Sequence, residues 1–174
     1  MLTGATSAAQ EGFERKHIMN YIKAQKEIFN ELCNGRRLGR FNIDENNILV
    51  SPDGFKAYIF PVSTIAFSLE KIQEIKAIPV VELIKPENEL KLTNDLRIID
   101  RYRTARRLKK QNGRSTFVNC KFLECFQNPK FYQGESNLTT IVVTEQDYPV
   151  GIMLPIRAGW DDGTYYGDLE KDVV

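Results

Sequence analysis

ILVSPDGFKAYIFPV, residues 48–62, holds two short apolar runs separated by a Pro-Asp-Gly turn. Runs rich in Ile, Val, Phe and Tyr are typical of β-strands, and Pro52-Asp53-Gly54 is typical of the tight turn that joins two of them. Another short run, residues 41–43, comes just before this stretch. The three runs together predict an antiparallel meander.

A helix is predicted ahead of this meander, over residues 13–33. Its apolar residues recur at steps of three and four, and Asn34-Gly35 supplies a left-handed C-terminal stop. The remaining face carries Lys and Glu, which is the mixed polar surface of a helix that packs on a sheet by one side. We therefore expect this helix to cover the meander.

The same order of features returns in the second half of the chain. A brief helix opening at Asn119 precedes strand-like runs at 130–132, 138–144 and 150–156. The last run ends in a proline-containing tripeptide, as the first meander does at Phe60-Pro61-Val62. We expect an α+β fold in which helices pack on antiparallel sheets, and the repeated order is consistent with an internal duplication.

Residues 95–110 fit two structures. Their apolar residues have helical spacing, and Asn94-Asp95 in front and Asn112-Gly113 behind punctuate a helix well. As an alternative, residues 96–100 could extend the preceding strand. A helix is favoured here, and the strand stays open as the alternative.

The strongest charge feature is a basic cluster around this segment. Formal net charge is only +1, so affinity for nucleic acid must come from local clustering of Lys and Arg. Neutralisation of phosphates by such a cluster is independent of base sequence and sensitive to salt. The alternative is an ordinary solvated face. The cluster consists of Arg97, Arg101, Arg103, Arg106, Arg107, Lys109, Lys110 and Arg114.

Four segments, in order, give the chain a family resemblance. They are Val50-Ser51-Pro52-Asp53-Gly54-Phe55-Lys56-Ala57, Val81-Glu82-Leu83 with Glu89-Leu90-Lys91-Leu92-Thr93, Phe117-Val118-Asn119 with Phe122-Leu123, and Ile152-Met153-Leu154-Pro155-Ile156-Arg157. Together they resemble the bacterial DNA polymerase sliding clamps: a strand-turn-strand, an opening hairpin, a strand-to-helix entry and a closing strand. The chain has the length of about one clamp domain with additions, whereas a clamp subunit has three domains.

The resemblance implies a DNA-clamp-like fold acting without catalysis. We expect a module that makes sequence-independent phosphate contacts with duplex DNA and forms homo-oligomers, with a protein-protein interaction adaptor of the same fold as the alternative. An enzyme ranks third, because no catalytic residue can be assigned. His17 is the only histidine and is expected at the surface, and neither cofactor-binding nor metal-binding motifs occur in the sequence.

The remaining expectations concern organisation and compartment. We expect a flexible N-terminus over 1–12, one clamp-like domain over 13–158 and an acidic aromatic tail over 159–174. Trp160, Tyr165 and Tyr166 in that tail are candidate partner-binding residues. Three irregularly spaced cysteines predict free core thiols and a cytoplasmic protein, and the absence of a long apolar run predicts no membrane association.

Overall fold

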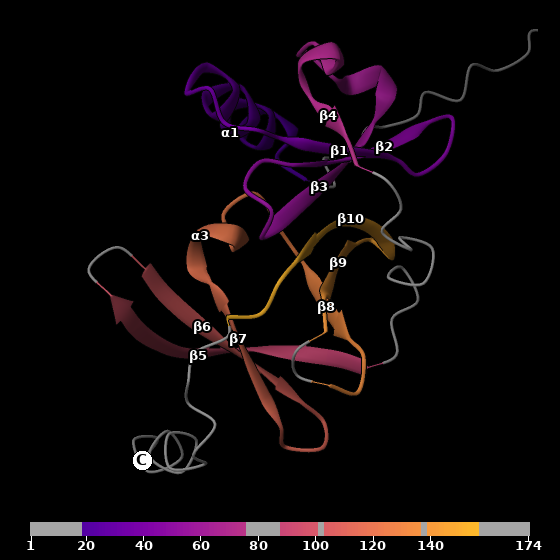
Figure 1. The fold of residues 1–174 in the computed structure, drawn as a ribbon. Helices are drawn as coiled ribbons and strands as arrows, with labels where there is room; N and C mark the ends of the chain where they lie inside the picture. Colours follow the sequence, from indigo (N-terminus) through magenta and orange to yellow (C-terminus); the bar gives the residue numbers. More distant parts are fainter. Residues whose placement is uncertain (1–18, 76–87, 101–102, 137–138, 157–174) are drawn as a thin grey trace, which may run out of the picture.

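The computed structural model describes residues 19–75, 88–100, 103–136 and 139–156, whose arrangement is shown in Figure 1. In this part of the chain the backbone forms ten strands, two α-helices and two short 3-10 turns. In chain order the elements are α1 (Tyr21–Cys33), β1 (Gly39–Asn42), β2 (Asn47–Ser51), β3 (Lys56–Pro61), η1 (Val62–Thr64), η2 (Leu69–Lys71), β4 (Gln73–Glu74), β5 (Asn88–Asp100), β6 (Arg103–Lys110), β7 (Ser115–Asn119), α3 (Cys120–Leu123), β8 (Lys130–Gln133), β9 (Ile141–Glu145) and β10 (Tyr148–Met153).

All ten strands belong to one sheet, in the order β4-β1-β2-β3-β10-β9-β8-β5-β6-β7. Neighbouring strands are antiparallel except β1 and β4. The six central strands are arranged symmetrically about the β3–β10 pair, because the meanders β1-β2-β3 and β8-β9-β10 meet at their last strands. Helix α1 precedes the first meander and α3 precedes the second. The predicted α+β class is thereby confirmed, while an internal duplication of the sequence stays a prediction.

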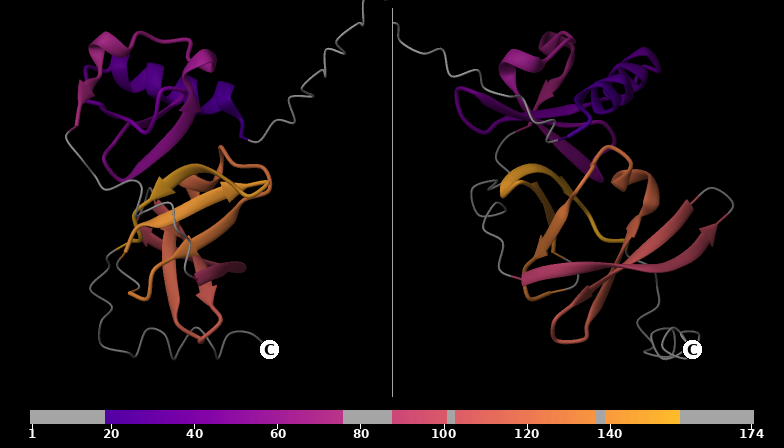
Figure 2. Two further views of the ribbon diagram at one scale, coloured as in Figure 1. Left: turned by 90° about the vertical axis from the view of Figure 1, so that its right-hand side faces the viewer. Right: turned by 180° about the vertical axis from the view of Figure 1, so that it is seen from behind.

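The sheet bends strongly along this order, as Figures 1 and 2 show. α1 and β1–β4 lie at one end of the molecule, and the long β5–β6 ribbon with β7 lies at the other. The strands β9 and β10 connect the two ends through the pairs β10–β3 and β9–β8. The turn between β6 and β7 is therefore far from α1.

Local hydrogen bonds build the β2–β3 turn as the sequence predicts. Asp53 Oδ1 accepts from the backbone N–H of Phe55 at 2.8 Å and from that of Lys56 at 3.1 Å. Gly54 takes a φ of 78°, a left-handed conformation that favours glycine. The Asp53 side chain and Gly54 together stabilise the reversal of the chain, so that Val50 pairs with Tyr58.

Helix α1 is shorter than predicted. The side chain of Asn20 caps it by accepting from Lys23 N–H at 3.0 Å, and the helix begins at Tyr21. Met19, just before the cap, pairs with Phe126 in an isolated bridge and is fully buried. The predicted helix is therefore wrong at residues 19–20, and its residues 13–18 lie outside the described part of the chain.

The central strands are buried on both faces. On β2, Ile48 and Val50 belong to the main core with α1, whereas Leu49 between them belongs to a smaller cluster on the opposite face. Side chains alternate across a strand, so a strand covered on both sides is apolar at consecutive positions. This explains the continuous apolar run that begins the quoted stretch.

The helix favoured for residues 95–110 is wrong, because this segment forms the β5–β6 ribbon. Ala105 pairs with Arg97 on β5 and Asn119 on β7, and Leu108 pairs in the same way with Leu92 and Thr116. Ala105 and Leu108 are both fully buried, three residues apart along one strand, and so lie on opposite faces. A three-residue spacing would also place both side chains on one face of a helix. Here the residues form a strand, because β6 pairs with β5 on one side and β7 on the other.

Candidate nucleic-acid interface

The predicted basic cluster is divided between the surface and the interior of the β5–β6–β7 region. Lys109 and Arg114 are exposed, Arg97 and Arg106 are half-buried, and Arg107 and Lys110 are buried. Arg101 and the side chain of Arg103 lie outside the described residues. The six described residues therefore do not form one solvated face.

Arg106 and Arg107 make contacts within the ribbon. Arg107 donates to Ser115 Oγ at 2.7 Å and pairs with the Asp95 carboxylate at 3.3 Å. Arg106 donates to the backbone carbonyl of Thr93 at 2.7 Å. The β5–β6 register shifts between Leu92 and Leu96, so these two guanidinium groups hold an irregular segment of β5 in place. These contacts give both residues a structural role, and their predicted contact with nucleic acid stays a prediction.

Lys110 ends β6 with its ammonium group in an unusual setting. Its Nζ donates to the backbone carbonyls of Gly134 at 2.7 Å and Glu135 at 2.9 Å, and the residue is 3% exposed. Burial and the nearby Arg114 lower the pKa of Lys110, and the Glu135 carboxylate opposes that effect. Two cations thus lie close together at the end of the ribbon.

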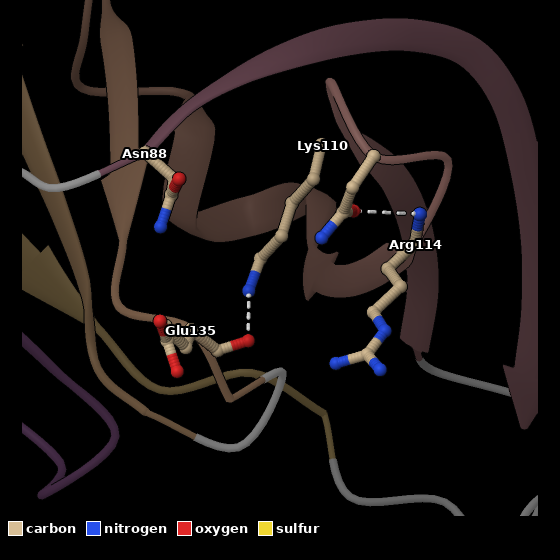
Figure 3. A pocket seen from close by; sticks show the side chains of 5 residues that line it. Asn88, Lys110, Arg114 and Glu135 are labelled. Carbon is tan, nitrogen blue, oxygen red and sulfur yellow. Dashed lines mark hydrogen bonds between the residues drawn. The ribbon is translucent and has the colours of Figure 1, made fainter.

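A polar pocket of about 490 Å³ opens at this point, and Figure 3 shows it from close by. Its lining residues come from the start of β5, the end of β6, the β6–β7 turn and the loop after β8. They are Asn88, Lys110, Asn112, Arg114 and Glu135. A smaller hollow of about 240 Å³ shares Asn88, Lys110 and Asn112 and adds Glu89 and Gln111.

Lys91 is a further cation at this end that the sequence prediction missed. It lies directly opposite Lys109 in the β5–β6 pair, and both side chains are exposed. Like charges directly opposite on neighbouring strands are destabilising. The missed signal is the strand register, since Lys91 is far from Lys109 in sequence and joins it only through the pairing.

A second polar cluster joins α1, β3 and the residues after α3. Lys56 Nζ pairs with Glu27 at 2.6 Å, and Tyr58 OH donates to the same carboxylate at 2.6 Å and lies 3.4 Å from Cys125 Sγ. Burial raises the pKa of Cys125 and of Tyr58. The thiolate is the reactive form of cysteine, and a raised pKa keeps Cys125 protonated. The cluster is therefore better explained as structural than as a nucleophilic site.

All three cysteines are free, as predicted, but only one of them is buried. Cys125 lies in the main core, Cys120 is half-buried and Cys33 is exposed at the end of α1. The prediction that all three are core residues is therefore corrected. In the described residues no group of three or more His, Cys, Asp or Glu side chains is placed to hold a metal ion.

Several predicted features fall outside the part of the chain that the structure describes. These are His17, the aromatic residues Trp160, Tyr165 and Tyr166, and the segments 1–12 and 159–174. Among the described helices, none has the length and apolarity needed to cross a membrane.

Comparison of the chain with protein-family models, with curated proteins and with solved structures finds no match.

Proposed function

We propose that the protein is a non-catalytic module that contacts the phosphates of duplex DNA without reading base sequence. The contact surface is the basic ribbon end, formed by Lys91, Lys109, Lys110 and Arg114. The observation that carries the proposal is a pair of cations on each face of the ribbon end. Lys91 lies directly opposite Lys109 on the exposed face. Lys110, whose side chain points to the other face, lies close to Arg114. Counted over the described residues, four cations lie at this end of the ribbon with two carboxylates, Glu89 and Glu135. An external polyanion relieves their mutual repulsion.

The strand order supports the clamp-like part of the proposal. Two meanders, each preceded by a helix, meet at their last strands, which is the paired arrangement that the sliding-clamp resemblance implies. Assembly into homo-oligomers through outer strands belongs to the same proposal, since unpaired strand edges are ready templates for pairing.

A protein-interaction adaptor is the second candidate function, favoured by exposed apolar side chains. Leu96 and Ile98 on β5 are 58% and 82% exposed, and Ile22 and Phe29 on α1 are 82% and 58% exposed. Exposed apolar side chains gathered on one element are more typical of protein contact than of phosphate contact. In this reading the fold is the same and DNA is not bound.

The test is the salt dependence of binding to a short duplex of arbitrary sequence. Four neutralised phosphates give a slope of log affinity against log salt of about −3.6, and affinity falls by about 150-fold from ~50 to ~200 mM salt. The double variant Lys91→Gln/Lys109→Gln removes two exposed cations and should reduce the magnitude of the slope by about 2. Both side chains are exposed, so the fold should persist.

Lys26→Gln is the matched control, because Lys26 is an exposed lysine on α1, at the other end of the sheet. It should leave affinity and slope unchanged. If the unaltered protein does not bind duplex at low salt, the DNA proposal fails and the adaptor takes its place. A double variant that binds as the control does would remove the basic ribbon end from the proposal.

A further inference from the structure

We infer that the pocket lined by Lys110 and Arg114 is a site for one phosphoryl group. The inference rests on the proposed function, because it names the chemical group that the basic ribbon end recognises and the side chains that hold it. The pocket's volume of about 490 Å³ lies within the range of small-molecule sites. It therefore has room for a phosphate together with the sugar that carries it.

Lys110 supplies a fixed cation at the pocket wall. The two carbonyls of Gly134 and Glu135 take two of its three ammonium protons, and the ammonium makes no other hydrogen bond or ion pair among the described residues. One donor is thus left for a ligand. Because the ammonium is already held and largely desolvated, a bound anion gains a charge-assisted hydrogen bond at little cost in side-chain ordering.

Arg114 supplies the second cation and the element of shape recognition. Its backbone N–H donates to Asn112 Oδ1 at 3.0 Å, which fixes the turn on which the side chain stands. Its guanidinium is exposed and makes no hydrogen bond or ion pair with any described side chain. The planar fork of Arg matches the oxygen atoms of a phosphate bidentately, which a lysine cannot do.

Two carboxamides complete the set of donors. Asn112 uses its oxygen on the Arg114 backbone, so its amide NH2 is left as a donor, and Asn88 contributes a second carboxamide at the start of β5. Figure 3 shows the Lys110 ammonium between the Asn88 carboxamide and the Arg114 guanidinium. A tetrahedral anion with several acceptor oxygens suits donors that approach from different sides.

Among the described residues, Glu135 is the one acidic side chain lining this pocket, and it makes the inference testable in both directions. In Figure 3 its carboxylate and the Arg114 guanidinium lie on opposite sides of the Lys110 ammonium. The carboxylate is exposed, while the contact with Lys110 comes from the Glu135 backbone. Neutralising this side chain therefore leaves the lysine contact in place and removes a charge that repels an anion.

The experiment is an NMR titration of the full chain with inorganic phosphate, following the backbone amides of residues 112–115 and 134–135. Saturable shifts at these amides are expected. Arg114→Gln should weaken apparent affinity by about tenfold or more, the effect of losing a hydrogen bond between charged groups. Glu135→Gln should strengthen it by about two- to fivefold, as expected for an exposed charge. Lys26→Gln should change nothing.

The inference is overturned if these amides do not shift, or if Arg114→Gln binds phosphate as the unaltered chain does. A second comparison identifies the source of the group, using duplexes of one sequence with 5′-phosphate or 5′-hydroxyl ends. Loss of affinity in Arg114→Gln with both duplexes indicates internal phosphodiesters, and loss only with the phosphorylated duplex indicates a terminal phosphate. Either result supports the phosphoryl site.

The two proposals can fail separately. Phosphate binding at the pocket without any duplex binding would refute the DNA function and leave the phosphoryl site standing. Salt-dependent duplex binding that Arg114→Gln does not weaken, together with no amide shifts on phosphate addition, would refute the site and leave the DNA function standing.

Discussion

At the scale of single residues, Glu145 shows how burial sets the behaviour of a carboxyl group. The residue ends β9 and is 2% exposed, and its Oε1 accepts from the backbone N–H groups of Gln127 and Asn128. Its Oε2 has no hydrogen-bond partner among the described residues. Burial raises the pKa of Glu145, and the two backbone hydrogen bonds oppose that shift without cancelling it.

A pH-dependent loss of stability follows from this raised pKa. Folding favours the protonated carboxyl, so its stabilising contribution is complete below the ordinary Glu pKa of 4.5 and is lost as pH rises through the folded-state pKa. Glu145→Gln keeps the Oε1 acceptor and removes the titration. We expect the stability of the variant relative to the unaltered protein to increase from pH 4 to pH 7.

Urea unfolding at several pH values measures this difference directly. The buried amide of the new Gln adds a cost that does not depend on pH, so the trend with pH, rather than the absolute free energy of unfolding, is the readout. A difference that stays constant across the range would show that Glu145 titrates in the folded protein as it does in the unfolded chain.

At the scale of elements, the sequence predicted correctly those elements that contacts between neighbouring residues stabilise. The β2–β3 turn depends on Asp53 and Gly54, and both hydrogen bonds of the Asp53 side chain lie within four residues of the chain. The β5–β6 ribbon depends instead on distant partners and on bulges that break the alternation of apolar residues. Its helical spacing is a by-product of burying Ala105 and Leu108 on opposite faces. Only the pairing of β6 with its neighbouring strands distinguishes a strand from a helix in this segment.

The bulge in β5 should depend on the Asp95–Arg107 ion pair. The Arg107 side chain is 6% exposed and that of Asp95 is 25% exposed. Asp95→Ala removes the carboxylate opposite a buried guanidinium, and we expect a loss of about 2–3 kcal/mol in the free energy of unfolding. Hydrogen exchange should show loss of protection in β5 and β6, because the ribbon is the element that this pair holds.

An exposed ion pair provides the comparison for that variant. Lys23 and Glu124 pair at 2.8 Å with side chains 46% and 55% exposed. Glu124→Ala should cost less than about 1 kcal/mol, because exposed pairs contribute little. Equal losses in the two variants would contradict the structural role given to Arg107.

At the scale of the whole molecule, the candidate site arises where distant segments meet. The basic run in the sequence contains Lys110 and Arg114, and both were predicted to bind phosphate. The pocket also needs Asn88 and Glu135, which reach it from β5 and from the loop after β8. The antiparallel pairing of β5 with β6 and β8 brings these segments together. A motif with fixed spacing along the sequence could therefore not have predicted the pocket.

Within this sheet the two meanders pair with each other through β3 and β10, and Gly151 is central to that pairing. Gly151 pairs with Tyr58 on β3 and with Val143 on β9, next to a register shift in β10. A Cβ at this position would lie 2.8 Å from the carbonyl oxygen of Ala57 and 3.1 Å from the Phe126 ring. The close backbone approach explains the need for glycine here.

Gly151→Ala should therefore destabilise the protein by about 2 kcal/mol, because a backbone carbonyl cannot move aside without disturbing the strand pair. Gly39→Ala is the matched control, since a Cβ there would meet the flexible Ile75 side chain at 3.2 Å, and it should cost less than about 1 kcal/mol. Chemical denaturation of the two variants under identical conditions compares these losses. If Gly151→Ala proves no more damaging than Gly39→Ala, the β3–β10 contact is looser than described, and the two meanders are not held together by close packing at this pair.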